Sequence, residues 1–212
     1  MDVAKPLMII FSILIILTAF WSLFNTLTQF RIKNIELEYI TKFIYFLGTT
    51  ISMSFYIFCH IFIDKFRFKK FLAISVIIIT TFPLYMYTDL IIGKYYVDNN
   101  SYHWEHGKLA FIFFIEFFYF VFYGLYILIK EFFNRRASGM GSSVLKSLIA
   151  CFSIGFIPPI IFSIILPLFG NYSYDWLAII FTPFWFILIW FNIVNGNLFT
   201  TKSNVIEIIL YL

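Results

Sequence analysis

The chain has 212 residues, of which 62% are hydrophobic and 24% aromatic, while only 12% are charged. Soluble domains carry roughly one-quarter charged residues, so this composition excludes an ordinary soluble globule. The net charge of +4 does not indicate nucleic acid as a partner, because the basic residues lie beside apolar runs, where they set membrane topology. We therefore expect a multi-pass membrane protein surrounded by membrane lipids.

Six apolar runs are each long enough to cross roughly 30 Å of hydrocarbon, a length that takes about 20 residues of helix. In chain order they are 6–30, 36–63, 71–92, 109–133, 147–170 and 177–199. We expect an all-α integral membrane protein, with a bundle of six transmembrane helices over residues 1–199. Residues 200–212 are expected to form a cytoplasmic connector that leads into an output domain.

Lys and Arg are unevenly distributed between the two ends of these runs. Along alternate connectors, ten of the 15 fall on the side that holds both termini. Cytoplasmic loops carry the excess of basic residues, so both termini are predicted to be cytoplasmic. The expected location is the inner (cytoplasmic) membrane, with the aromatic connector 93–108 on the external side.

The second run carries polar side chains at spacings of three and four residues, which keep them on one face of a helix. We call this face the polar stripe; its members are Glu38, Lys42, Tyr45, Thr49, Ser52, Tyr56 and His60. Lipid excludes such a face, so it must turn into the bundle or into a wet cleft. The stripe is either a structural seam of interhelical hydrogen bonds or the lining of a ligand site, and the sequence leaves both open.

Glu116, in the fourth run, is the acidic residue that lies deepest in an apolar stretch. A carboxylate in hydrocarbon is normally paired, hydrogen-bonded or protonated. Tyr119, Tyr123 and Tyr126 follow it at helical spacing, so acid and phenols are expected to share a face, where the phenols either donate to the acid or line the same pocket. The alternative is that Glu116 reaches outward to the interface. The candidate ligand-binding residues are Glu38, Lys42, Tyr45, Thr49, Ser52, Tyr56, Glu116, Tyr119 and Tyr123.

The sequence contains none of the common motifs for nucleotide binding, zinc proteolysis or a serine nucleophile. Its two cysteines, Cys59 and Cys151, lie in apolar runs and form no CxxC pair, which argues against a disulfide framework or a thiolate metal site. We therefore expect no enzymatic activity, cofactor or metal site in this chain. Prolines inside the third, fifth and sixth runs, including the pair Pro158–Pro159, predict distorted helices.

A series of features follows a fixed order from Glu38 to Thr201. It comprises a mid-helix glycine, a basic turn, a proline-bearing helix, an aromatic external loop, a basic loop, a helix with paired prolines and a closing segment: Gly48, 64–70, Pro83, 104–107, 134–136, 155–159 and 195–199. In this order the chain resembles the N-terminal seven-transmembrane input region of bacterial histidine kinases, which also precedes cyclases and serine phosphatases. Six of the seven helices are present.

The resemblance implies a signal-input (sensor) module. A small or lipid-like ligand would bind between the helices, and a helix shift would pass to a cytoplasmic histidine kinase, cyclase or phosphatase domain, as in two-component systems. Such an output domain would also make the protein a homodimer. The alternative is a small permease or proton-coupled transporter that uses the polar stripe and Glu116. A membrane-embedded enzyme ranks last, because its acids and histidines would lie at opposite depths.

Overall fold

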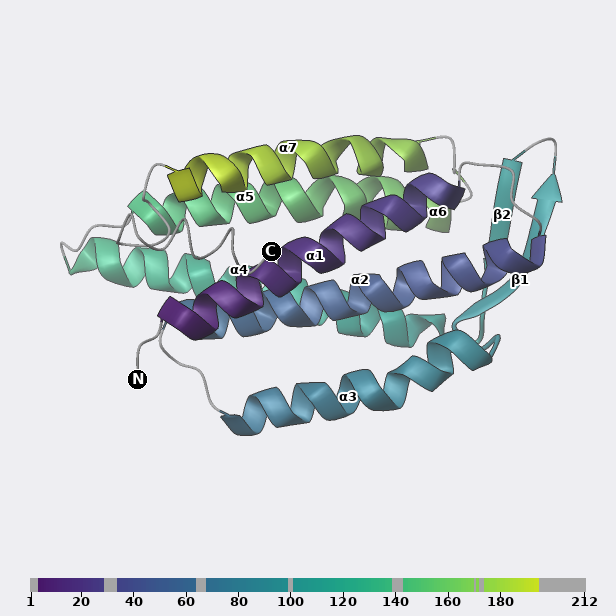
Figure 1. Cartoon of the computed structure of the whole chain (residues 1–212), viewed down its shortest axis with the longest axis horizontal. Helices are drawn as coiled ribbons and strands as arrows, with labels where there is room; N and C mark the ends of the chain where they lie inside the picture. The colour runs from purple at the N-terminus through teal and green to yellow at the C-terminus, as the bar shows by residue number, and fades with distance from the viewer. Residues whose placement is uncertain are drawn as a thin grey trace.

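The computed structural model describes residues 4–28, 34–63, 68–98, 101–138, 143–169, 171 and 174–194. Over these residues six helical rods lie side by side, each running opposite to the one before it, and a short hairpin lies at one end (Figure 1). The rods are α1 (Ala4–Thr28), α2 (Asn34–Phe62), α3 (Phe68–Tyr87), α4 (Ala110–Ala137), α5 (Ser143–Pro159) with its continuation, and α7 (Asp175–Val194). The connector expected at 200–212, and basic residues such as Arg31 and Lys65 that enter the orientation argument, lie outside the described residues.

Four helical stretches in the described part of the chain are long and apolar enough to cross a bilayer: Pro6–Thr28, Leu37–Phe62, Ala110–Ala137 and Ser143–Leu168. The apolar part of α3, Phe71–Tyr87, is shorter, and α7 has 20 residues, about the length that a crossing takes. Each predicted run overlaps one of the six rods. The prediction of a six-helix bundle is confirmed, and four of the helices have the length and apolar composition of membrane spans.

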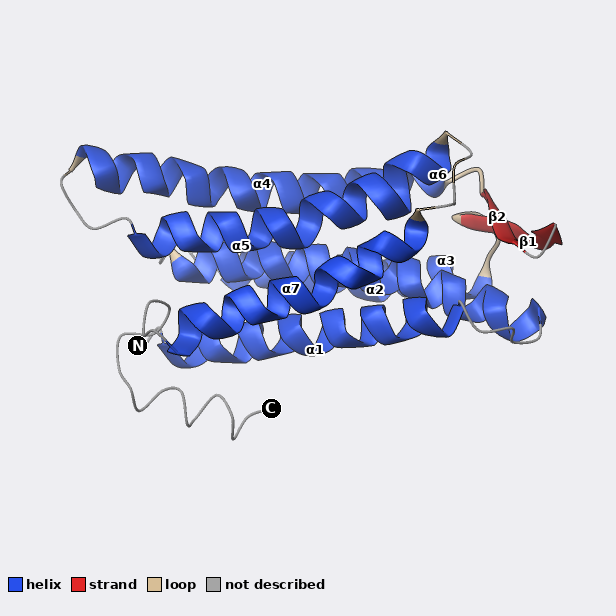
Figure 2. Cartoon of the chain, turned by 90° about the horizontal axis from the view of Figure 1, so that it is seen from above, coloured by secondary structure: helices blue, strands red, loops and turns tan. Residues whose placement is uncertain are grey.

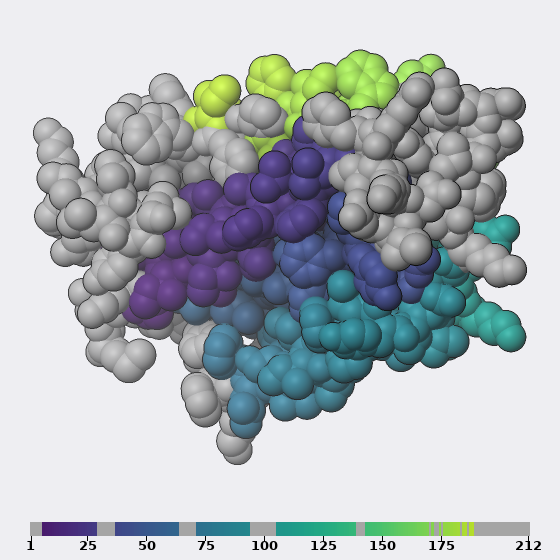
Figure 3. Space-filling view, turned by 45° about the vertical axis from the view of Figure 1, so that its right-hand side comes forward, coloured from purple at the N-terminus to yellow at the C-terminus, as the bar shows by residue number. Residues whose placement is uncertain are grey.

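The polar helix α2 lies at the centre of the bundle. It packs mainly against α1, α3 and α4, whereas α5 and α7 pack on each other, and α5 also contacts α2 through phenylalanine rings (Figure 2). Inside the chain, 83% of the apolar window of α2 is buried, compared with 39% for α1 and 44% for α4. The space-filling view accordingly shows α2 as a band between α1 and α3 (Figure 3). The helix with the polar stripe is thus the one best shielded from lipid.

Phenylalanine rings join the central helix to its neighbours. The Phe55 ring of α2 contacts Phe152 and Phe156 of α5, with centroids 4.5 and 4.9 Å apart. Gly124 of α4 lies against the same ring, since a Cβ at this position would stand 2.7 Å from Phe55 Cε1. The small residue therefore sets how closely α2 and α4 approach, as small residues do in membrane helix pairs.

The fifth helix is distorted where the sequence predicts it. α5 runs without a break into a π-helical turn, η1 (Ile160–Ile165), and then into the short helix α6 (Leu166–Leu168). The π turn directly follows Pro158 and Pro159. Proline supplies no amide hydrogen and crowds the preceding turn, so a wider turn lets the helix continue past the pair.

The segment between α3 and α4 differs from the sequence prediction. The third run was expected to stay helical to Ile92 and to lead into an irregular loop, but α3 ends at Tyr87. An antiparallel hairpin of β1 (Ile92–Asp98) and β2 (Ser101–His106) follows. Its strands are rich in tyrosine, which favours extended backbone. We call the end of the bundle where this hairpin lies the hairpin end.

Replacing Gly124 with alanine is expected to destabilise the bundle by about 1–3 kcal/mol, the usual cost of overpacking a core. Phe55 is fully buried and held by two other rings, so α2 and α4 must separate to admit the methyl group. Gly48→Ala in α2 is the matched control, because its Cβ would lie 3.6 Å from Phe113, an ordinary contact. Thermal unfolding in detergent, followed by circular dichroism, measures both; equal melting temperatures for the two variants would contradict this view of the interface.

Candidate functional site

A buried cation lies on α2 near the hairpin end. Lys42 Nζ donates to Glu38 Oε1 at 2.6 Å and to Asp89 Oδ1, beyond the end of α3, at 2.7 Å. The Lys42 side chain is only 4% exposed, whereas those of Glu38 and Asp89 are 37% and 73% exposed. Two carboxylates that reach the surface therefore hold one ammonium group in the interior. We call these three residues the ion triad.

Asp89 is the member of the ion triad that sequence reasoning missed. The spacing of Lys42 and Glu38 predicts their pairing within one helix, but Asp89 is 47 residues away in the chain. Gly107 holds the turn in place, because a Cβ there would overlap the carbonyl oxygens of Asp89 and Leu90. The only available signal was an acid at the end of an apolar run, which is too common to be specific.

A second polar cluster joins three helices deeper in the bundle. Tyr85 of α3 is fully buried; its hydroxyl lies 2.9 Å from Thr49 Oγ1 of α2 and donates to Glu116 Oε2 of α4 at 3.3 Å. The Thr49 hydroxyl also lies 3.3 Å from the Tyr45 carbonyl oxygen, to which it can donate, and either hydroxyl can be the donor in the Thr49–Tyr85 contact. We call these residues the hydroxyl relay. Tyr85 too was missed, because nothing in its local sequence points to Glu116.

The rest of the polar stripe is buried as well. Tyr45, Ser52, Tyr56 and His60 are each less than 10% exposed, so the prediction that this face turns away from lipid agrees with the structure. The Ser52 hydroxyl donates to the Thr49 carbonyl at 2.7 Å. Tyr56 contacts His60 on its own helix and Phe120 on α4, with centroids 4.6 and 5.4 Å apart.

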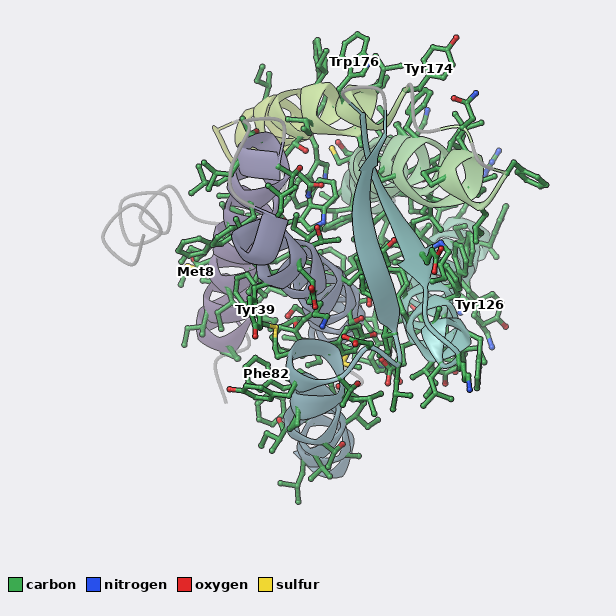
Figure 4. The ribbon with its side chains drawn as sticks, turned by 90° about the vertical axis from the view of Figure 1, so that its right-hand side faces the viewer. Met8, Tyr39, Phe82, Tyr126, Tyr174 and Trp176 are labelled. Atoms are coloured by element: carbon green, nitrogen blue, oxygen red, sulfur yellow. The ribbon has the colours of Figure 1, made fainter. Side chains whose placement is uncertain are left out.

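The α4 tyrosines share a helix face with Glu116, but none of them hydrogen-bonds to it within the described residues. Glu116 receives its hydrogen bond from Tyr85, while Tyr119, Tyr123 and Tyr126 are 54%, 39% and 52% exposed. Their rings contact one another in sequence at 5.6 and 5.9 Å, and Tyr123 also reaches Tyr56 of α2 at 5.8 Å. We call the three the tyrosine row. Figure 4, which looks at the hairpin end, places Tyr126 at the outer edge of the bundle.

The hairpin contributes one titratable ring to the core. His106, the last residue of β2, packs against Phe114 and Tyr45, with centroids 5.5 and 6.4 Å apart. Neither of its ring nitrogens forms a hydrogen bond within the described part of the chain. Burial lowers the pKa of His106, because loss of water penalises the charged imidazolium.

The two polar clusters connect helices and provide charged groups. Over the described residues, His, Cys, Asp and Glu side chains form no group of three or more that could hold a metal ion. The ion triad and the hydroxyl relay both connect α2 to α3, and the relay continues to α4. Chemically, these clusters can recognise a ligand by charge and hydrogen bonding, or can exchange partners when helices move.

Removing the carboxylates of the ion triad is expected to cost more stability than removing its cation. In the double variant Glu38→Gln, Asp89→Asn, a buried ammonium loses both counter-charges, at a cost of about 3 kcal/mol. In Lys42→Met the stranded carboxylates still reach water, so the loss is expected to stay below about 1 kcal/mol. Denaturant unfolding in mixed micelles measures the difference. A larger loss in Lys42→Met would contradict it.

Stability is expected to fall at mildly acidic pH because of His106. The lowered pKa means that the unfolded chain takes up this proton at a higher pH than the folded chain. The contribution of the neutral ring is therefore complete above about pH 6.5, the ordinary histidine value, and is lost as the pH falls below it. His106→Phe removes the titration, so its melting temperature should vary less between pH 7.5 and 5.5. An unchanged pH dependence in the variant would rule His106 out as the cause.

Comparison with known proteins gave no match to this chain among family models, curated proteins or solved structures.

Proposed function

We propose that the chain is a signal-input module of the inner membrane, as its resemblance to the input region of histidine kinases implies. The observation that carries the proposal is the polar network at the hairpin end, where the ion triad and the hydroxyl relay join α2, α3 and α4. Each of these helices runs from the hairpin end to the opposite end. A ligand that replaces one of these hydrogen bonds or ion pairs therefore shifts the positions of the helices along the whole bundle.

Orientation follows from the ends of the helices. α1 begins and α7 ends at the end of the bundle opposite the hairpin (Figure 2). The same end carries basic residues of α4 and α5, among them Arg135, Arg136 and Lys146. Because basic residues favour the cytoplasmic side, we infer that both termini are cytoplasmic and that the hairpin is external. Ligand would then enter from outside, and an output domain, itself the site of dimerisation, would follow α7.

A continuous row of buried rings links the network helix to the output helix. Phe55 of α2 contacts Phe152 of α5 at 4.5 Å, and Phe152 contacts Trp185 of α7 at 6.0 Å. Trp185 lies so close to Gly155 of α5 that a Cβ there would stand 2.5 Å from the indole. Close packing of this kind passes a displacement of α2 to α7, provided that the ligand binds the two arrangements with different affinity.

The alternative, a permease or proton-coupled transporter, would use the same side chains differently. Glu116 would carry a proton or bind the substrate, and the polar stripe would form the path. The hydroxyls of Thr49, Ser52 and Tyr85 are instead engaged with partners inside the bundle. This arrangement favours a network that responds to ligand over an open path, and transport is one outcome of the test below.

The test uses the full-length gene product in membrane vesicles. Tyr85→Phe removes the hydroxyl at the centre of the relay and is expected to change the activity of the output domain severalfold. Thr80→Val is the control, since this exposed hydroxyl on the same helix bonds only carbonyls of its own helix, those of Val76 and Ile77. Proteoliposomes with an internal pH dye should show no proton uptake that depends on Glu116. Uptake that is lost in Glu116→Gln, or a reading frame that ends without an output domain, would overturn the proposal in favour of a permease.

A further inference from the structure

The tyrosine row lies where tyrosine is unusual. All three residues belong to the middle third of α4, whereas tyrosines of membrane helices concentrate at the two interfaces. Their side chains are 39–54% exposed, and none of their hydroxyls is hydrogen-bonded within the described part of the chain. Unpartnered hydroxyls in hydrocarbon cost free energy, so this flank of α4 favours a neighbour that is not purely apolar.

Glu116 lies on the same flank, two helical turns from the hairpin end of α4. One carboxylate oxygen accepts the hydrogen bond of Tyr85, and the other has no partner among the described residues. Its charge is also unmatched there, because Lys42 is held by Glu38 and Asp89, and Arg135 is held by Glu131. A carboxylate in an apolar environment is normally paired, hydrogen-bonded or protonated, and a cationic occupant of this flank supplies the partner for the ionised form.

Aromatic faces and a carboxylate together recognise alkylammonium groups. The negative face of a ring attracts a cation within about 6 Å of its centroid, and the row already holds one example, since Lys130 Nζ lies 5.8 Å from the centroid of Tyr126. At the other end of the row, Glu116 lies one helical turn before Tyr119 on the same face of α4, and its ionised form adds a negative charge beside the stacked rings of Tyr119 and Tyr123. This combination selects a positive head group over a neutral or an anionic one.

We propose that the flank of α4 formed by Glu116, Tyr119 and Tyr123 binds a membrane-borne amphiphile with an ammonium head group. The head group lies between the carboxylate and the two rings, and the alkyl body lies in the bilayer along α4, beside exposed side chains such as Ile115 and Phe122. Entry is lateral, from the outer leaflet. The proposal rests on the signal-input function and names its ligand class. Pairing with the second oxygen of Glu116 places the ligand on the carboxylate that accepts from Tyr85, which connects the ligand to the hydroxyl relay.

Three probes with the same alkyl chain test the head group. Dodecylamine, dodecanol and dodecanoate, each below its micellar concentration, are added to the full chain in nanodiscs, and bound molecules are counted by native mass spectrometry. We expect dodecylammonium to bind at least tenfold more tightly than the other two. Equal binding of all three would show an ordinary lipid-facing surface. A dimer that forms without any probe and is lost in the double variant Tyr119→Leu, Tyr123→Leu would show that a second copy covers the row. Either result overturns the proposal.

Variants of α4 locate the site. Glu116→Gln, and separately the exposed double variant Tyr119→Leu, Tyr123→Leu, should each weaken dodecylammonium binding at least tenfold. The double variant keeps the test decisive if Glu116→Gln does not fold. Tyr119→Phe, Tyr123→Phe retains the ring faces and should bind nearly as well as the native chain. Glu131→Gln is the control on the same helix, because Glu131 pairs with Arg135, and it should leave binding unchanged; an equal loss in this control would overturn the assignment.

The two proposals can fail separately. Ammonium binding with no effect on the output of the full-length gene product would leave the site standing and contradict the signal-input function. An output that responds to Tyr85→Phe, together with no preference for dodecylammonium, would contradict the ammonium site alone.

Discussion

The burial of Lys42 is the constraint on which the arrangement of the bundle depends. An ammonium group this far from water requires carboxylates, and α2 alone supplies only one, at Glu38. The second comes from Asp89 after the end of α3, so the ion triad fixes how the turn beyond α3 sits against α2. The other buried polar side chains of the polar stripe also require surroundings inside the bundle. Helices α1, α3 and α4 surround α2, while α5 and α7 pack on each other.

The polar groups of the site differ in how far they are exposed at the surface of the bundle. The ion triad meets the surface through its carboxylates at the hairpin end, whereas the hydroxyl of Tyr85 is enclosed by three helices. Glu116 belongs to both the interior and the flank, since it accepts a hydrogen bond from the relay and borders the tyrosine row. This position makes it the natural point at which an event in the bilayer reaches the interior of the bundle.

Much of the fold follows from local sequence, because helix length and one-sided polarity are encoded within each run. The six helices and the burial of Thr49, Ser52 and Tyr56 were predictable on this basis. The partners from α3 were not, since Asp89 and Tyr85 lie 47 and 31 residues from Lys42 and Glu116, and such pairs depend on packing. The hairpin was missed because its tyrosines also suit a membrane interface, which made residues 93–108 resemble an anchored loop.

The π turn after Pro158–Pro159 has a geometric consequence for the end of α5. A turn closed by i→i+5 bonds holds one residue more than an α turn, so side chains beyond it are rotated by about 100° relative to an uninterrupted helix. The direction in which Leu166–Leu168 faces is therefore offset from the one that a regular continuation of Ser143–Pro159 would give. Shortening the turn by one residue would restore regular winding and would rotate Leu166–Leu168, at the hairpin end of this helix, while Ser143–Pro159 kept its contacts.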